Sequence, residues 1–193
     1  MLPEEWKVRP VPEWQVKYKF VSPYTSYTSH FTKTIYLAAG IFANPDSVLY
    51  QAVIRHESEH VEQGKRFPLG GWFWSICYAA GIPCMFAIPV LLSFAIAHSW
   101  LWLIGVWVCA LITFASRNLR LEAELDAEAA ELFERWRLQG FTDNPDTLAR
   151  FVSADRLHVF GRPYWMFGVD QAFINHAVVE RARKRIKEHL SGR

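Results

Sequence analysis

Two histidines and two glutamates occur in the order His56-Glu57-Ser58-Glu59-His60, which is an HExxH pattern. Two imidazoles four residues apart on a helix lie one turn apart on the same face, so both can bind one metal ion. Glu57 stands beside them, where its carboxylate can take a proton from a water molecule that zinc has made more acidic. The pattern predicts one zinc ion per chain, with His56 and His60 as ligands and Glu57 as the general base of a hydrolytic reaction.

The helix that must carry this motif is predicted to begin at Asn44-Pro45-Asp46-Ser47 and to end near Gln63, before Gly64. A capping residue followed by proline is typical of a helix start, and glycine is typical of a helix end. The two histidines share one helical stripe with apolar residues that must face the core. They therefore point toward a neighbouring element that can supply a third ligand. The stripe comprises Leu49, Ala52, Val53, His56 and His60.

A catalytic zinc ion has three protein ligands and one open position. In the gluzincin class of zinc peptidases, which this spacing resembles, the third ligand is a Glu on a later helix. An Asp four residues further on holds a ligand histidine. Here Glu122 and Asp126 have that spacing within residues 117–139, a Leu-, Ala-, Glu- and Arg-rich segment predicted to be a helix that stops at Gly140. We assign Glu122 to zinc and Asp126 to a hydrogen bond with His56, and Glu124 is the alternative third ligand.

An uncharged stretch separates the two motifs, since no residue from Phe67 to Ser116 carries a formal charge. It consists of two apolar runs, 71–97 and 99–116. The first is long enough to cross a bilayer core of about 30 Å, and the second is at the short end of that range. A buried hairpin in a soluble core is the alternative, but a chain of 193 residues can hardly cover two helices that are apolar on every face. We expect a transmembrane or membrane-associated helical hairpin at 71–116, inserted in a single domain, 1–193.

The charge distribution predicts the orientation of this hairpin. Its tip lacks Lys and Arg, whereas both flanking arms contain them, so the positive-inside rule puts both termini and the active site on the cytoplasmic side. A formal net charge of +2 gives no reason to propose a nucleic-acid partner, because such a partner needs basic residues concentrated on a surface, and the dense basic run at 181–187 is interpreted as the solvated face of the last helix. The three cysteines all lie in the apolar stretch, which argues against a disulfide framework. The expected localisation is integral membrane, and the sequence carries no signal for an oligomeric state.

The segment from Arg55 to Val61, the apolar hairpin, and the segment from Ser116 to Asp126 together resemble the core of the HtpX-type integral-membrane zinc endopeptidases. The chain is also similar to the minigluzincins, which have a short sheet before the HExxH helix. The resemblance covers roughly residues 33–140, and no pair of apolar segments precedes the motif. It implies an α+β, mainly helical zincin-like fold with a short N-terminal sheet. It also implies a zinc endopeptidase that cleaves membrane or membrane-proximal proteins, with a peptide or protein substrate and the lipid bilayer as partners.

The remaining expectations concern the two ends of the chain. Residues 15–21 alternate polar and apolar, and residues 33–37 are rich in β-branched and aromatic side chains, so two or three strands are expected within 1–43. Further helices are expected from Asn144 to about Phe160 and from Asp170 to Leu190. In gluzincins, an edge strand binds the substrate peptide, and the candidate strand is Lys33, Thr34, Ile35, Tyr36 and Leu37. Candidate donors to the oxyanion of the reaction are His158, Arg162 and Tyr164.

Two other functions compete with the peptidase. One is a metal-binding membrane adaptor that has kept the fold and lost catalysis, although Glu57 is intact. The other is a hairpin membrane protein in which the HExxH pattern arose by chance and binds no metal.

Overall fold

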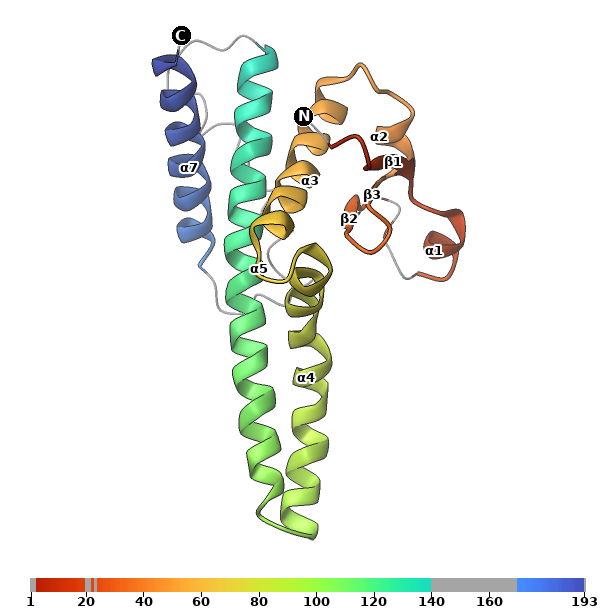
Figure 1. Ribbon diagram of the computed structural model, residues 1–193, viewed down its shortest axis with the longest axis vertical. Helices are drawn as coiled ribbons and strands as arrows, with labels where there is room; N and C mark the ends of the chain where they lie inside the picture. The colour runs from red at the N-terminus through yellow and green to blue at the C-terminus, as the bar shows by residue number, and fades with distance from the viewer. Residues whose placement is uncertain (1–2, 20–21, 23, 140–169, 193) are drawn as a thin grey trace.

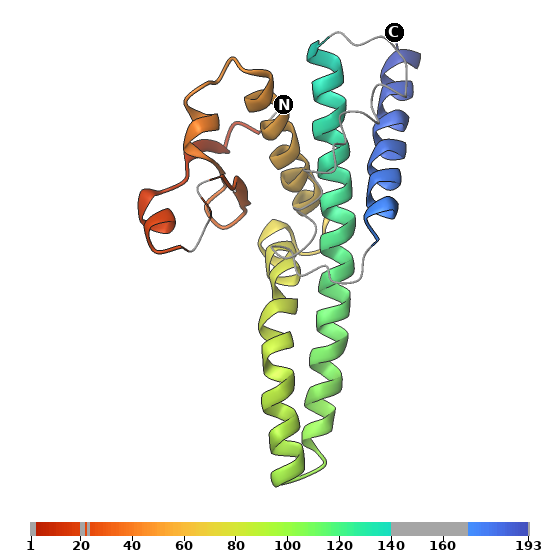
Figure 2. The ribbon, with the colours of Figure 1, turned by 180° about the vertical axis from the view of Figure 1, so that it is seen from behind.

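The computed structural model describes residues 3–19, 22, 24–139 and 170–192. This part of the chain is mostly helical and has a small three-stranded sheet near its N-terminus, which confirms the expected α+β class. Two long helices form a hairpin that projects from the rest of the molecule, and the sheet lies at the opposite end from the hairpin tip (Figure 1). In both ribbon views, the longest helix lies between the motif helix and the C-terminal helix (Figure 2).

The sheet consists of β1 (Lys7–Pro10), β2 (Tyr27–Ser29) and β3 (Thr34–Leu37), in the order β1-β3-β2. Strand β1 runs parallel to β3, and β2 runs antiparallel to it. The expected strand at 33–37 is therefore present, but it is the central strand and not an edge strand. Its own backbone groups are used on both sides, so it cannot add a substrate peptide. Its side chains Ile35 and Leu37 are fully buried and pack against the motif helix.

The strand expected at 15–21 is wrong, because α1 (Glu13–Lys17) occupies this position. Pro12 precedes the helix, Glu13 lies in its first turn and Lys17 in its last, which suits the helix dipole. The helix-favouring residues at the two ends of this segment therefore decided its structure, and the alternation of polar and apolar residues did not. A second short helix, α2 (Ala39–Phe42), follows β3.

The motif helix is α3 (Val48–Arg66), which confirms the predicted helix but not its predicted start at Asn44-Pro45. The cap is Ser47, whose Oγ accepts a hydrogen bond from the backbone N–H of Tyr50 at 3.0 Å. The helix continues through Gly64 instead of ending there. A Cβ at Gly64 would lie 2.2 Å from Nε2 of His30, so this glycine makes room for an imidazole against the helix. His30 in turn bonds the backbone carbonyl of His60 at 3.1 Å and Ser75 Oγ at 3.1 Å.

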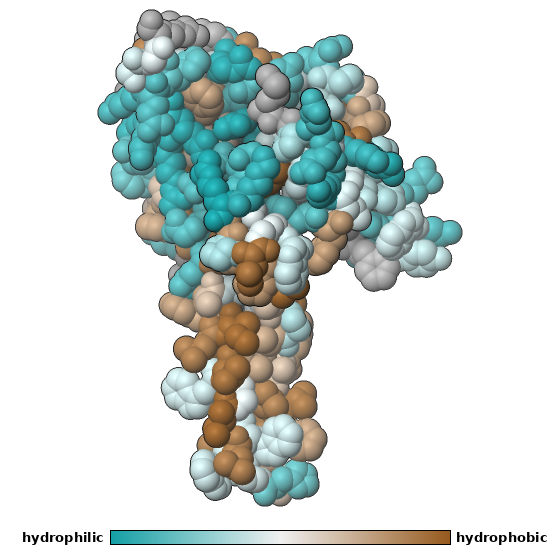
Figure 3. Space-filling model, viewed as in Figure 1, coloured by the Kyte–Doolittle hydropathy of each residue, from teal (hydrophilic) through white to brown (hydrophobic). Residues whose placement is uncertain are grey.

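The hairpin consists of α4 (Gly71–Ala97) and the first half of α5 (Trp102–Gln139). Within the described residues, α4 and α5 are both long and apolar enough to cross a membrane. Where the sequence suggested a separate helix after Ser116, α5 runs without a break from the hairpin tip to Gln139. Large apolar side chains are exposed along the projecting part (Figure 3), among them Phe86, Val90, Phe94, Ile96, Ile104, Trp107, Leu111 and Phe114.

The C-terminal helix is α7 (Gln171–Ser191), which confirms the expected final helix. Asp170 caps it by accepting a hydrogen bond from the N–H of Ala172. It packs along the second half of α5 and buries the larger apolar cluster of the described residues. That cluster comprises Leu125, Ala129, Leu132, Ile174, Val178, Ala182 and Ile186. The helix expected between Asn144 and Phe160 lies outside the described residues.

Candidate metal centre

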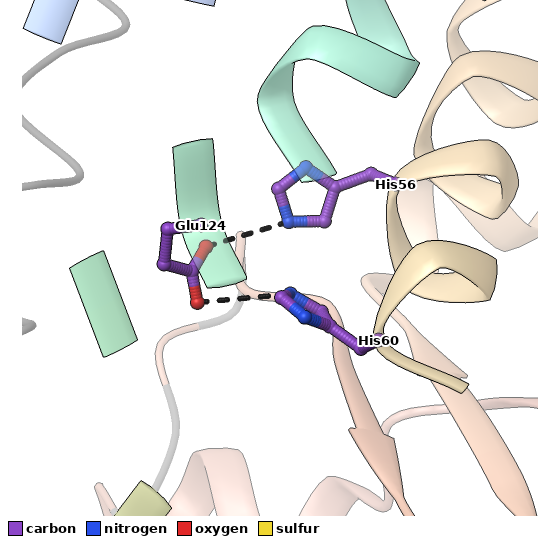
Figure 4. A group of neighbouring side chains, drawn as sticks. All are labelled: His56, His60 and Glu124. Atoms are coloured by element: carbon purple, nitrogen blue, oxygen red, sulfur yellow. Dashed lines mark ion pairs between the residues drawn. The ribbon is translucent and has the colours of Figure 1, made fainter. Parts of the chain in front are cut away.

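His56 and His60 lie one turn apart on the face of α3 that packs against α5. Their ring centroids are 5.1 Å apart, and both residues are buried. Both rings point away from α3 toward the same carboxylate (Figure 4). The HExxH spacing has therefore brought two imidazoles to one point, as the helical period requires.

That carboxylate belongs to Glu124 of α5. Its Oε2 lies 3.6 Å from His56 Nε2, and its Oε1 lies 3.6 Å from His60 Nε2. Two ligand atoms that are each about 2.0–2.2 Å from a tetrahedral zinc ion lie about 3.3–3.6 Å from one another. The three side chains together could hold a metal ion, since one ligand atom from each lies within 4.8 Å of the others.

The burial of these groups supports a binding role for them. The side chain of Glu124 is only 2% exposed, and its Oε2 has no hydrogen-bond partner among the described residues. A buried charged oxygen without a partner costs stability unless a cation compensates it. The set of two imidazoles and one carboxylate therefore fits a divalent cation.

The prediction that Glu122 is the third ligand is wrong, because the Glu122 side chain points away from the two histidines. Successive residues of a helix are rotated by about 100°, so residues two apart point to nearly opposite sides. Glu122 is 62% exposed and pairs with Arg181 of α7, its Oε2 lying 2.6 Å from Nη2. Asp126 pairs with the same guanidinium at 2.7 Å, and so it does not hold His56. Glu124, the alternative to Glu122, is the carboxylate that lies with His56 and His60.

Two other glutamates of α5 take the place expected for Asp126. His56 Nδ1 lies 3.4 Å from Glu131 Oε2 and 3.8 Å from Glu128 Oε1. Arg135 donates to Glu131 Oε1 at 2.8 Å and so fixes that carboxylate. The spacing of four residues is kept, but between Glu124 and Glu128, two positions later than predicted. A carboxylate at Nδ1 favours the tautomer of His56 whose Nε2 is free to bind a metal.

His60 is oriented by a different partner. Its Nδ1 lies 2.9 Å from Oε1 of Gln63, and the amide of Gln63 donates to the backbone carbonyl of Ala123 at 3.0 Å. With Gln63 Oε1 as acceptor, Nδ1 donates its hydrogen to Gln63, and Nε2 is the ring nitrogen that faces Glu124. Gln63 thereby connects the ligand helix α3 to the backbone next to the third ligand. Gln63 was not among the predicted site residues, although its position three residues after His60, on the same helical face, is the signal that could have identified it.

Glu57 is buried beside the two histidines, with only 3% of its surface exposed. Thr28 of β2 donates its hydroxyl hydrogen toward Glu57 Oε2, 2.8 Å away, and the backbone carbonyl of Glu57 lies 3.1 Å from the same hydroxyl. The strand that borders the motif is therefore β2, and in the described sheet β2 is an edge strand. No sequence pattern singled out Thr28, because its short strand was not among the predicted ones.

The charges of this cluster depend on one another. Burial by itself lowers the pKa of His56, but the carboxylates of Glu124 and Glu131 outweigh it, and the pKa lies well above its usual value. Burial raises the pKa of Glu57, and the two histidines and the Thr28 hydroxyl only partly oppose it. For Glu124, which lies beyond the apolar part of α5, burial is outweighed by His60 and His56, and the pKa falls to about 2. Glu124 is therefore an anion at neutral pH, as a metal ligand must be.

The first turns of α4 close the site from the side of the hairpin. The indole of Trp74 packs against His60, with ring centroids 5.8 Å apart, and the hydroxyl of Tyr78 donates to Glu124 Oε1.

The candidate oxyanion donors lie outside the described residues. They are His158, Arg162 and Tyr164.

No family model matches this chain, and neither a curated protein nor a solved structure matches it. The resemblance to the HtpX-type peptidases thus consists of the motifs and their order along the chain.

Proposed function

We propose that this protein is a zinc-dependent endopeptidase that cleaves peptide bonds of membrane or membrane-proximal proteins. The observation that carries the proposal is the convergence of His56, His60 and Glu124 from two helices, with the carboxylate of Glu57 buried beside them. These are the parts that hydrolysis at a metal ion requires: three ligands and a base.

Zinc is the proposed metal, because two imidazole nitrogens and one carboxylate oxygen with an open position suit it better than magnesium or calcium, which prefer oxygen ligands. When bound, zinc would polarise the scissile carbonyl and make a water molecule acidic enough to attack it. His56 and His60 would bind through Nε2, because their Nδ1 atoms face Glu131 and Gln63, respectively.

Glu57 would act as the general base. Its carboxylate would accept a proton from the attacking water and deliver it to the nitrogen of the departing amine. The hydroxyl of Thr28 engages Oε2, so Oε1 is the oxygen proposed to receive the proton. Burial of Glu57 favours this role, because a carboxylate whose pKa is raised is a stronger base than an exposed one.

The proposed substrate class follows from where the site lies. Helices α3 and α5 approach each other at the base of the hairpin, so with the hairpin across a bilayer the site lies near the membrane surface. The distribution of Lys and Arg then favours the cytoplasmic side for the site and both termini. A substrate peptide could add to β2, the edge strand that carries Thr28.

The test compares wild-type protein with Glu57→Gln in detergent, both loaded with zinc, on an unfolded fluorescent protein substrate. We expect cleavage by the wild type and a loss of about 10²–10⁴-fold in Glu57→Gln, because the amide cannot accept the proton. Glu62→Gln is the matched control, since Glu62 lies on the same helix in an exposed pair with Lys65. Zinc-loaded wild type no more active than Glu57→Gln would favour the inactive metal-binding adaptor.

A further inference from the structure

Tyr78 brings the first helix of the hairpin into contact with the metal centre. It lies on α4, and its phenol donates a hydrogen bond to Oε1 of Glu124 on α5. The ring also lies near His60, with centroids 6.4 Å apart.

The position of the phenol is fixed by packing within the hairpin. The guanidinium carbon of Arg120 lies 4.6 Å from the centre of the Tyr78 ring, and the Trp74 ring centroid is 4.8 Å away. The hydroxyl of Ser116 donates to the backbone carbonyl of Tyr78 at 3.0 Å. A Cβ at Gly81 would lie 2.8 Å from Ser116 side-chain atoms, so α4 and α5 approach closely there because Gly81 has no side chain.

This contact distinguishes the two oxygens of Glu124. Oε1 accepts the hydrogen bond from Tyr78, whereas Oε2 is buried without a hydrogen-bond partner and faces His56 Nε2 at 3.6 Å. A hydrogen bond from a hydroxyl to a carboxylate is strong because the acceptor is charged, and it fixes the rotation of the group. Oε2 is thus the oxygen with no other hydrogen-bond donor to share it with a metal, although Oε1 also lies 3.6 Å from His60 Nε2.

We propose that Tyr78 is a positioning residue that holds Glu124 as the third zinc ligand, and that zinc affinity therefore depends on how the two hairpin helices pack. This inference rests on the proposed zinc site. It assigns to a helix of the apolar hairpin a part in the metal centre, in addition to any part in membrane attachment.

The variant that tests it is Tyr78→Phe, which keeps the ring and its contacts with Arg120 and Trp74 and removes only the hydroxyl. The readout is the dissociation constant for zinc in detergent, measured by competition with a chromophoric chelator. Hydrogen-bond partners of metal ligands typically contribute 10–100-fold in affinity, and we expect a rise of about that size. Tyr50→Phe is the control, because Tyr50 also loses a phenol oxygen but packs in the cluster between α3 and the sheet.

A second pair of variants tests the dependence on helix packing. In Gly81→Ala, the new methyl group would press on Ser116 at 2.8 Å, and we expect weaker zinc binding. In Gly105→Ala, nearer the tip, the methyl group would meet Leu91 at an ordinary 3.5 Å, and we expect no change. Thermal melting of the zinc-free proteins shows whether each variant remains folded.

The outcomes separate this inference from the proposed function. Wild-type protein that binds no zinc overturns both. Wild-type protein that binds zinc tightly, together with a folded Tyr78→Phe whose dissociation constant is within about twofold of it, overturns the role of Tyr78 alone. An unchanged dissociation constant in folded Gly81→Ala overturns the dependence on helix packing.

Discussion

Glu124 and Glu122 lie two residues apart on α5, but their surroundings differ in burial, charge and partners. Glu124 is 2% exposed and faces two imidazoles of α3. Glu122 is 62% exposed and pairs with a guanidinium of α7. One face of α5 thus collects buried polar groups from α3, and the opposite face docks α7 through surface ion pairs and an apolar cluster.

The difference shows which carboxylates of a helix can do chemistry. An exposed ion pair such as that of Glu122 is screened by water and contributes little to stability. A buried carboxylate loses its hydration, and its neighbours must compensate for that loss. Around Glu124 the compensation comes from two histidines and a phenol, and two of these groups, His56 and His60, could hold a metal ion together with Glu124. We therefore expect changes on the α3 face to act on the metal and on catalysis, and changes on the α7 face to act on stability alone.

Among the groups that orient the two histidines, the largest effect is expected for Glu131→Gln. The amide cannot hold His56 Nδ1 or Arg135 as the carboxylate does, so the zinc dissociation constant should rise by about 10–100-fold. Chelator competition measures it. Glu134→Gln is the control, because Glu134 is on the same helix and pairs with Arg137 instead of a histidine. Equal zinc affinity in both variants would show that Glu131 does not orient His56.

Thr28→Val should lower turnover by about tenfold, because a hydrogen bond to a charged group contributes about 1.5 kcal/mol or more. The valine keeps the shape of threonine and removes the hydroxyl next to Glu57 Oε2. In Thr28→Val we expect kcat to fall while the zinc content stays unchanged. In Thr28→Ser, which keeps the hydroxyl, we expect most of the wild-type rate to be recovered. Loss of zinc in Thr28→Val, or no recovery with serine, would contradict a role in positioning the base.

The smallest effect is expected on the other face, for Arg181→Gln. It breaks the pairs with Glu122 and Asp126, which are 62% and 44% exposed, so the free energy of unfolding should fall by at most about 1 kcal/mol. Thermal melting of the zinc-free protein measures the change, and the zinc dissociation constant should stay the same. A clear loss of zinc affinity would mean that the two faces are coupled.

The motif helix could be predicted from sequence because its signals are local. The apolar stripe that includes His56 and His60 depends only on residues within α3. The apolar hairpin could be recognised for the same reason, since hydropathy and length are properties of the segment itself.

The third ligand could not be predicted, because it depends on the rotation of α5 against α3. That rotation is set by tertiary packing, in which Leu125, Ala129 and Leu132 face α7 and thereby turn Glu124 toward the histidines. The repeated glutamates of this helix look alike in sequence. In the same way, the composition of residues 33–37 predicted a strand but could not show that β1 and β2 flank it on both sides.

The most direct test is the zinc content of detergent-purified protein, measured by plasma mass spectrometry for the wild type, His60→Ala, Glu124→Ala and Glu122→Ala. We predict about one zinc ion per chain in the wild type and in Glu122→Ala, and its loss in His60→Ala and Glu124→Ala. Zinc retained in Glu124→Ala and lost in Glu122→Ala, or a wild type that binds no zinc when it is supplied, would contradict the metal centre described above.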